Sequence, residues 1–222
     1  MHYPRFKAWL LVGALFAIAC GACERRSVPD AAGDTAPPPP ADPDGAAEAR
    51  VTPALGISVP DEELVDQDGA PVRLRDLAKD HALAVNFIFT TCTTICSPMT
   101  AIFGRLQAEL GDSLERDVRL VSITLDPAVD TPERLKRYAD KFNRRAGWVF
   151  LTGSRDRVAR VLEAFGGRAP VKEQHAPLTL LGRPSEGRWR RVDGIAAPRR
   201  LADEIRSLLQ PRGAAARSDE GG

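Results

Sequence analysis

Residues 83–90 form an almost unbroken apolar run in the middle of the chain. A run of this length and composition is typical of a strand that is buried on both faces. Such a strand needs a layer of packed structure on each side of its sheet. Residues 118–125 and 148–151 are similar and predict two more buried strands. We therefore expect one domain built around a central sheet that is covered on both sides.

Helical patterns follow these strands. Apolar residues recur at helical spacing in residues 99–110. Two further helices are predicted to begin at Thr131 and Ser154, whose hydroxyls are suited to cap a helix N-terminus. A final helix is expected where apolar residues recur at helical spacing in residues 201–208. These helices provide the layers that the buried strands require.

Two hairpins complete the expected fold. An Asp-Gly turn at residues 68–69 predicts two short strands within residues 64–72. A second hairpin is expected from residues 177–181 and 189–192. The resulting order predicts a thioredoxin-like α/β fold, with a mixed central sheet, helices on both faces and an N-terminal hairpin.

The N-terminus carries an export signal. Two basic residues precede an apolar run at residues 8–19, which as a helix would be about 18 Å long and too short for a ~30 Å hydrocarbon core. We assign residues 1–22 to a bacterial signal peptide. Lipidation of Cys20 in a lipobox-like sequence is the leading alternative, beside ordinary cleavage near Ala19 or Ala22 and an uncleaved anchor. All three place the remaining chain beyond the cytoplasmic membrane, and a lipid anchor would hold it at the periplasmic face.

The remaining chain divides by composition. Residues 23–51 are rich in Pro, Ala, Asp and Gly and predict a disordered tether. Residues 52–210 carry the strand and helix patterns, and residues 211–222 predict a flexible tail. Lys and Arg number 31 against 30 Asp and Glu, so no net field favours binding to nucleic acid.

The loop after the first buried strand holds the most informative residues. Cys92 and Cys96 lie where open α/β sheets place their ligand sites, between the end of a strand and the start of a helix. If Cys96 begins the helix, both thiols can face one crevice, and the helix N-terminus favours the thiolate. Thiolates attack disulfides and bind soft metals. A structural disulfide, two buried spectator cysteines and a redox pair are the alternatives, and the spacing of four residues does not decide between them.

His175 is the candidate third ligand. It stands in the loop before an expected strand, whereas His2 lies in the signal peptide and His81 in a polar turn that predicts a surface position. In a thioredoxin-like fold the loop with His175 borders the cysteine loop. Two thiolates and one imidazole suit Cu(I), Cu(II) or zinc. Zinc usually takes a fourth ligand, and Met99 is expected in the core rather than on a metal.

The sequence resembles the Sco/SenC family of copper-binding thioredoxin-fold proteins that assist assembly of cytochrome c oxidase. The similarity covers residues 58–209 and lies mainly in four segments, at residues 66–72, 86–96, 121–127 and 130–133, together with His175. It implies one copper ion on Cys92, Cys96 and His175. It also implies an acidic residue close to the site within the segment from Asp126 to Asp130, and we assign this role to Asp126.

Some positions depart from the family pattern. Ser97 separates the second cysteine from Pro98, whereas family members have the proline directly after it. Gln174 stands where many members carry Asp, and the strand after His175 lacks the usual aromatic residue. Pro177, two residues after the histidine, raises the question of a cis peptide bond. These differences predict a divergent branch and bear on the partner more than on the metal site.

The leading hypothesis is a metallochaperone rather than an enzyme. The resemblance implies delivery of copper to the dinuclear copper centre of cytochrome c oxidase subunit II, with another periplasmic copper protein as the alternative acceptor. A second hypothesis is a thiol–disulfide reductase, in which Cys92 attacks and Cys96 resolves the mixed disulfide. A third is a copper or redox sensor that uses the same site. His175 discriminates, because a redox pair does not require it.

Overall fold

The structure, a computed structural model, describes residues 49–168, 171–172 and 175–211 of the 222-residue chain. The expected signal peptide with Cys20, most of the expected tether and nearly all of the expected tail lie outside the described residues. In the ranges that are described, we find no helix with the length and apolar character needed to cross a membrane.

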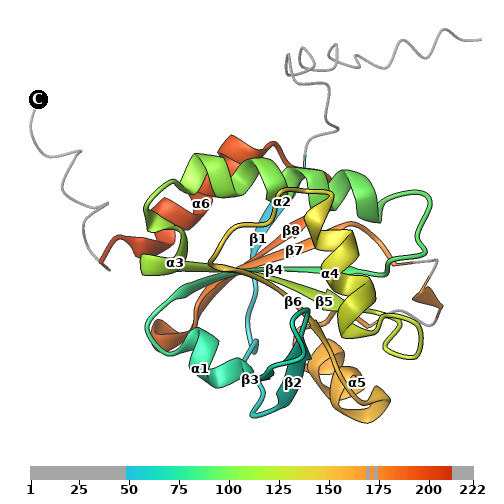
Figure 1. The fold of residues 1–222 in the computed structure, drawn as a ribbon. Helices are drawn as coiled ribbons and strands as arrows, with labels where there is room; N and C mark the ends of the chain where they lie inside the picture. Colours follow the sequence, from blue (N-terminus) through green and yellow to red (C-terminus); the bar gives the residue numbers. More distant parts are fainter. Residues whose placement is uncertain (1–48, 169–170, 173–174, 212–222) are drawn as a thin grey trace, which may run out of the picture. The chain divides into compact units, whose positions relative to one another are not determined.

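The described chain folds into strands and helices, beginning with three successive strands (Figure 1). The strands are β1 (Arg50–Pro53), β2 (Glu63–Asp66), β3 (Pro71–Arg73), β4 (Ala82–Ile88), β5 (Val118–Thr124), β6 (Trp148–Thr152), β7 (Leu178–Arg183) and β8 (Arg188–Asp193). The helices are α1 (Leu74–Ala78), α2 (Cys96–Leu110), α3 (Ser113–Arg116), α4 (Pro132–Asp140), α5 (Arg155–Ala164) and α6 (Pro198–Leu209), with a 3-10 turn at Pro184–Glu186.

The strands form one mixed sheet in the order β1-β8-β7-β4-β5-β6-β2-β3. β4, β5 and β6 run parallel, and the other pairs are antiparallel. The register between β4 and β5 runs from Ala82 opposite Val118 to Ile88 opposite Thr124. Since these two strands end together, the loops that lead to α2 and α4 begin side by side at one end of the sheet.

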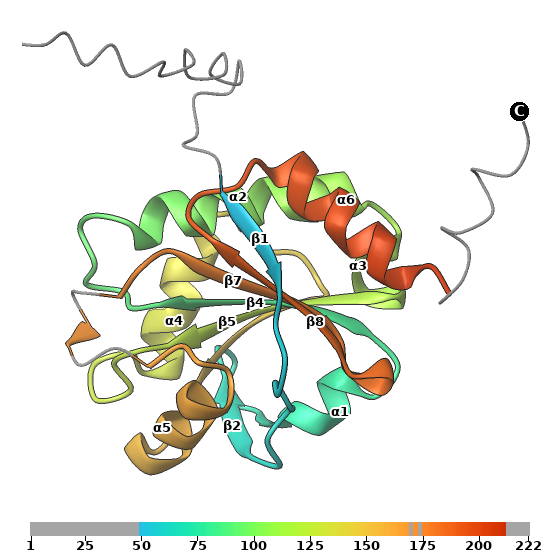
Figure 2. The same cartoon turned by 180° about the vertical axis from the view of Figure 1, so that it is seen from behind.

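Each face of the sheet has its own core. α2, α4 and α6 pack on one face against Ala84, Ile88 and Leu120, and α1 and α5 pack on the other against Val85 and Phe87. The two layers are visible from both sides, with α2 and α6 above the sheet and α1 and α5 below it (Figures 1 and 2). The alternation along β4 explains why its sequence reads as continuously apolar, because both faces are buried.

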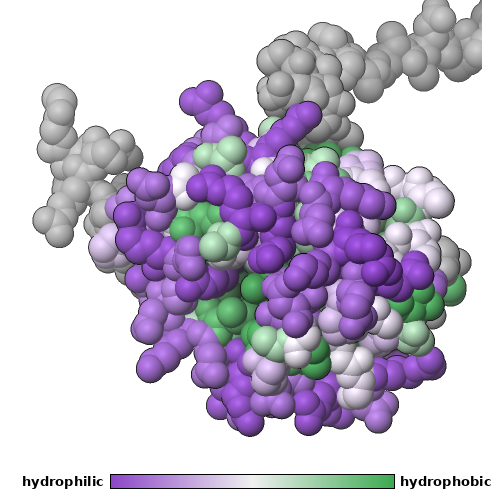
Figure 3. All heavy atoms as spheres, in the orientation of Figure 1, coloured by the Kyte–Doolittle hydropathy of each residue, from purple (hydrophilic) through white to green (hydrophobic). Residues whose placement is uncertain are grey.

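The outer surface is mostly polar. The face drawn in Figure 3 is largely hydrophilic, with apolar residues in small separate groups. Among the described residues, the large apolar side chains that are exposed are Leu55 and Val171. The core therefore accounts for most of the apolar content that the sequence carries in this domain.

The predicted capping residues do cap their helices. The Thr131 hydroxyl accepts from the N–H of Arg134 at the start of α4, and the Ser154 hydroxyl accepts from the N–H of Arg157 at the start of α5. Pro132 follows Thr131, where a missing N–H leaves no intrahelical bond unmade. The cap on α4 fixes the direction in which the chain leaves the β5–α4 loop.

The thioredoxin-like α/β fold and the N-terminal hairpin, which is β2 with β3, are confirmed. The expected boundary of the tether at residue 51 lies inside a strand, because Arg50 and Val51 pair with β8. α2 begins at Cys96, three residues before the predicted start, and β4 ends at Ile88 rather than at residue 90. The short helices α1 and α3 were not predicted.

Candidate metal centre

Cys92 and Cys96 are brought together at the start of α2. The N–H of Cys92 donates to the carbonyl of Phe89 over 3.1 Å, which turns the chain as it leaves β4. Cys96 is the first residue of α2, and its N–H donates to the sulfur of Cys92 over 3.4 Å. Both cysteines are free thiols; Cys92 is half-buried and Cys96 is 0% exposed. Cys96 therefore meets the condition under which both thiols were expected to face one crevice.

The two thiols differ in acidity. Burial opposes ionisation of Cys92, but hydrogen bonds from the side chain and N–H of Cys96 and from Thr94 outweigh it and lower its pKa to about 7. Burial raises the pKa of Cys96 to about 12, and the hydrogen bond to Cys92 and the charge of Asp130 act in the same direction. Above pH 7 the pair therefore holds mainly one thiolate, on Cys92, and one thiol, on Cys96.

His175 lies close to the cysteine loop through Phe89. The two rings meet edge to face with 6.0 Å between their centroids. His175 Nδ1 lies 3.0 Å from the carbonyl oxygen of Lys172, which can only accept, so Nδ1 must carry the proton of this bond. In the neutral imidazole that leaves Nε2 with its lone pair available to a metal.

The three expected ligands are not yet one cluster. Across the described ranges, no group of three or more His, Cys, Asp or Glu side chains is arranged to hold a metal ion. The structure brings Cys92 and Cys96 together and places His175 beside Phe89, which adjoins their loop. The donor types nevertheless fit a soft metal ion, because they are two sulfurs and one imidazole nitrogen.

Asp126 contacts the segment that carries His175. Its carboxylate pairs with the ammonium of Lys172, and the same ammonium lies 5.3 Å from the centroid of the Phe89 ring. Asp126 and Lys172 are 13% and 31% exposed, so the pair is partly shielded from water. Asp126 is thus linked through Lys172 to the segment that carries His175.

Asp130 lies at the end of the segment in which the resemblance places an acidic residue, and it is hydrogen-bonded to the start of the cysteine loop. It is 0% exposed and accepts from the N–H of Thr90 at 3.2 Å, from the Thr90 hydroxyl at 2.5 Å and from the Thr124 hydroxyl at 2.6 Å. In the sequence it directly precedes the capping residue Thr131 and reads as part of a helix start. A buried carboxylate at this point becomes visible only when β4 and β5 are paired.

Other predicted positions are also settled. Met99 is 3% exposed and packs in the core, as expected. His81 was expected on the surface but is half-buried, and it precedes β4 at the end of the strand opposite the cysteine loop. The bond before Pro177 is trans, as are all the peptide bonds of the described residues. His2 and Gln174 lie outside the described residues.

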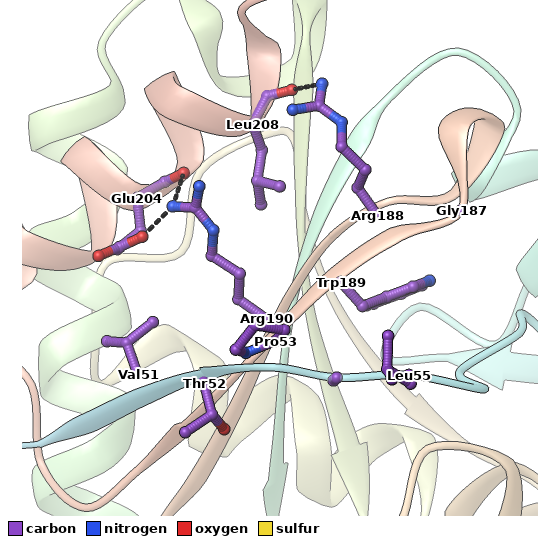
Figure 4. A pocket seen from close by; sticks show the side chains of 11 residues that line it. Val51, Thr52, Pro53, Leu55, Gly187, Arg188, Trp189, Arg190, Glu204 and Leu208 are labelled. Atoms are coloured by element: carbon purple, nitrogen blue, oxygen red, sulfur yellow. Dashed lines mark hydrogen bonds and ion pairs between the residues drawn. The ribbon is translucent and has the colours of Figure 1, made fainter. Parts of the chain in front are cut away.

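A groove of about 610 Å³ lies elsewhere, between β1, β8 and the end of α6 (Figure 4). Its charged side chains are paired, since Arg190 bonds to Glu204 and Arg188 bonds to the carbonyl of Leu208. Trp189 lines the groove and lies opposite Gly182 in the sheet. Gly182 in turn lies opposite Leu83, at the start of β4. The groove is therefore at the opposite end of the sheet from the cysteines and offers them no cavity.

The sheet order, the helical layers and the dithiol at the start of α2 define a thioredoxin-like thiol protein. The family model described as SCO1/SenC matches residues 58–210, and the chain belongs to this family. The resemblance to the Sco/SenC family, which was drawn mainly from residues 86–96, 121–127 and 130–133, is therefore confirmed.

Known relatives agree. A protein of Stutzerimonas stutzeri whose name proposes copper binding is 40% identical over 113 residues, which is 49% of this chain and 52% of the relative. The chain spans about half the length of the curated relatives it matches. The crystal structure of a SCO1/SenC family lipoprotein from Bacillus anthracis is similar, with 28% identity, a TM-score of 0.60 and coverage of 72% of this chain and 98% of that one.

BsSco gives the same picture, with 30% identity, a TM-score of 0.60 and the same coverage of 72% and 98%. It is described as a member of the Sco family of cytochrome c oxidase assembly proteins, and a disulfide switch was identified in it. Because a disulfide switch was identified in this relative, the oxidation state of the Cys92–Cys96 pair is considered with the proposed function below.

Proposed function

We propose that the protein is an exported copper chaperone that binds Cu(I) through Cys92, Cys96 and His175. The observation that carries the proposal is the hydrogen-bonded dithiol at the start of α2, with the imidazole of His175 beside the same loop. Two thiolates and an imidazole form a soft donor set, and Cu(I) is satisfied by three such ligands. The name of the Stutzerimonas relative supports copper as the metal.

The proposed acceptor is the dinuclear copper centre of cytochrome c oxidase subunit II, or another periplasmic copper protein. Membership of the SCO1/SenC family and the description of BsSco support a role in oxidase assembly. Cys92 is the half-buried, more acidic thiol, so an incoming ligand would reach the metal from its side. The described lipoprotein relative supports attachment to the membrane through the N-terminus.

Because the three donors do not form a metal-binding cluster among the described residues, the proposed site requires His175 to move closer to the two sulfurs. The bond from Nδ1 to Lys172 leaves Nε2 as the ligating atom, so the imidazole can bind without losing that bond. Asp126, through Lys172, is proposed to hold the segment near the cysteine loop while it does so. Copper binding displaces the protons of the thiols, because the thiolate is the ligand.

A competition titration of Cu(I) against a coloured chelator tests the proposal on the purified, reduced protein. We expect one tightly bound copper per chain, at least tenfold weaker binding in His175→Ala, and no tight binding in Cys92→Ser or Cys96→Ser. His81→Ala is the matched histidine control and should bind as the wild type does. Binding by the wild type that does not exceed the chelator background would contradict the copper-chaperone proposal. Unchanged affinity in His175→Ala would show that His175 is not the third ligand.

Thiol–disulfide reduction is the second candidate, and the asymmetry of the pair favours it. A thiol with a pKa of about 7 attacks disulfides readily at neutral pH, and the buried Cys96 is placed to resolve the mixed disulfide. Such a reductase would act on the acceptor's cysteines and would not need His175. Reduction of an oxidised acceptor domain that is unchanged in His175→Ala but lost in Cys92→Ser would favour this function.

A further inference from the structure

Two loops and the segment before β7 lie at the same end of the sheet as the cysteine pair. The β4–α2 loop carries Cys92, the β5–α4 loop carries Asp126 and Asp130, and the segment before β7 carries His175. A metal site that draws ligands from separate segments needs something to hold them in register. The hydrogen bonds at the end of the sheet identify which side chain does this.

Asp130 bonds the first loop to the second. Thr90, two residues before Cys92, gives the carboxylate both its N–H and its hydroxyl, across 40 residues of sequence. Arg134 also contacts the Thr90 hydroxyl, but its Nη2 is 3.4 Å away, whereas the Asp130 carboxylate is 2.5 Å away. The main tie on the cysteine loop is therefore the Asp130 carboxylate, which is shielded from water and held by three donors.

The same carboxylate continues toward His175. Thr124 donates its hydroxyl to Asp130 at 2.6 Å and accepts the N–H of Asp126 at 2.9 Å. The carboxylate of Asp126 pairs with Lys172, whose carbonyl oxygen holds Nδ1 of His175. A chain of polar contacts thus runs from Thr90 to the imidazole of His175, and the buried carboxylate of Asp130 lies within it.

We infer that Asp130 is a positioning residue that holds the cysteine loop in register with the loop that binds the His175 segment. The inference rests on the proposed function and adds to it, because it says how ligands from separate segments are presented together. Asp130 does not contact the metal in this scheme. Its positioning effect passes through Thr90 to Cys92 on one side and through Thr124 and Asp126 to Lys172 on the other.

The test compares Asp130→Asn with the wild-type protein. The amide nitrogen cannot accept a hydrogen bond, so at least one of the three donors loses its partner while the side chain keeps its size. In the reduced, metal-free protein we expect hydrogen exchange of the Thr90 amide to accelerate at least tenfold. In the Cu(I) competition titration we expect affinity to fall at least tenfold.

Ser122→Ala is the matched control. Ser122 is 0% exposed, donates to Asn86 at 2.6 Å and accepts from the indole of Trp148 at 3.0 Å, in the middle of the sheet and away from both loops. It should lower stability without changing Cu(I) affinity by more than twofold. Equal losses of affinity in the two variants would reduce Asp130 to a structural role and overturn the inference.

A double variant gives a readout that a merely structural role would not move. If Asp130 acts by presenting His175 together with the cysteines, Asp130→Asn should cost much less affinity when His175 is already Ala. Fully additive losses would contradict the inference.

If Asp130→Asn does not fold, Thr90→Val and Thr124→Val each remove one side of the path and should each weaken Cu(I) binding at least threefold. Unchanged affinity in both variants would overturn the inference.

The same experiments separate this inference from the proposed function. A wild-type protein that binds no copper would end the chaperone proposal, and the metal-free exchange of the Thr90 amide would still decide whether Asp130 holds the loop. Tight copper binding that Asp130→Asn leaves unchanged would keep the chaperone and remove the positioning role.

Discussion

The backbone N–H of Cys96 points at the sulfur of Cys92 over 3.4 Å, so the first turn of α2 is itself part of the dithiol site. The N–H groups of a helix N-terminus have no intrahelical partner and favour a negative charge. The sulfur of Cys92 receives that stabilisation. The same turn carries the side chain of Cys96 into the core, where burial disfavours its thiolate. One helix start thus makes two cysteines four residues apart chemically unlike.

This asymmetry predicts selective alkylation of the reduced protein. With a pKa of about 7, Cys92 is half ionised at neutral pH, and its reaction with iodoacetamide should rise with pH through a midpoint near 7. Cys96, buried and with a pKa of about 12, should react at least a hundredfold more slowly at pH 7.5. Mass spectrometry of the labelled peptides measures both rates, and the denatured protein is the control in which the two should react alike. Similar rates in the folded protein would contradict the assignment.

The two pKa values also set the pH dependence of copper binding. Both thiols must be deprotonated to bind, so protons compete with the metal and affinity falls as pH falls. Above pH 7 only Cys96 still carries its proton, and affinity should change about tenfold per pH unit. Below pH 7 Cys92 is protonated as well, and the change should steepen to at least about a hundredfold per unit. Titrations at pH 8.5 and 5.5 in weakly buffered solution would count the released protons, and an affinity independent of pH would contradict thiolate ligation.

Much of the fold follows from the sequence because burial leaves a pattern. The strand at residues 83–90 reads as continuously apolar because β4 is covered on both faces, and Thr131 and Ser154 mark helix starts through local chemistry alone. The cysteine loop was equally readable, since a strand followed by a helix defines where the site must lie. These signals are contained in short stretches of chain.

What the sequence did not reveal depends on distant partners. β1 is four residues long with a half-exposed centre, and it exists because β8 offers an edge to pair with. Asp130 and Lys172 resemble ordinary loop residues until Thr90 and Asp126 are placed against them. The hydrogen bond between Thr90 and Asp130 joins residues 40 apart in the sequence, and the spacing of apolar residues carries no information about such a contact. The polar contacts around the site could therefore not be predicted from one sequence.

Lys172→Met should loosen the hold on the His175 segment. The variant keeps the length of the side chain but loses the ion pair with Asp126 and the contact of the ammonium with Phe89. Because the pair is partly exposed, we expect less than about 1 kcal/mol of lost stability. Cu(I) affinity should fall about two- to tenfold, since holding His175 costs entropy that the ion pair no longer offsets.

Lys136→Met is the matched control for that experiment. Lys136 forms a comparable ion pair with Asp68 at 2.7 Å, more exposed and on the outer side of α4. Its loss should leave Cu(I) affinity unchanged. Equal affinities for the wild type and Lys172→Met would show that Asp126 and Lys172 do not help to place the imidazole.

Gly182 should be among the most sensitive positions of the sheet. It faces Trp189 across the β7–β8 hairpin, and a Cβ built there would overlap the indole, which is 5% exposed and packed against Phe165. Because the ring is enclosed, Gly182→Ala forces either the ring or the strand to move, and overpacking of this kind typically costs about 1–3 kcal/mol. Gly182→Ala should therefore lower the midpoint of chemical unfolding without directly altering the cysteine site, which lies at the other end of β4.

In a Trp189→Phe background the smaller ring leaves room, and the same substitution should cost less stability. Equal costs in the two backgrounds would show that the indole is not the obstacle.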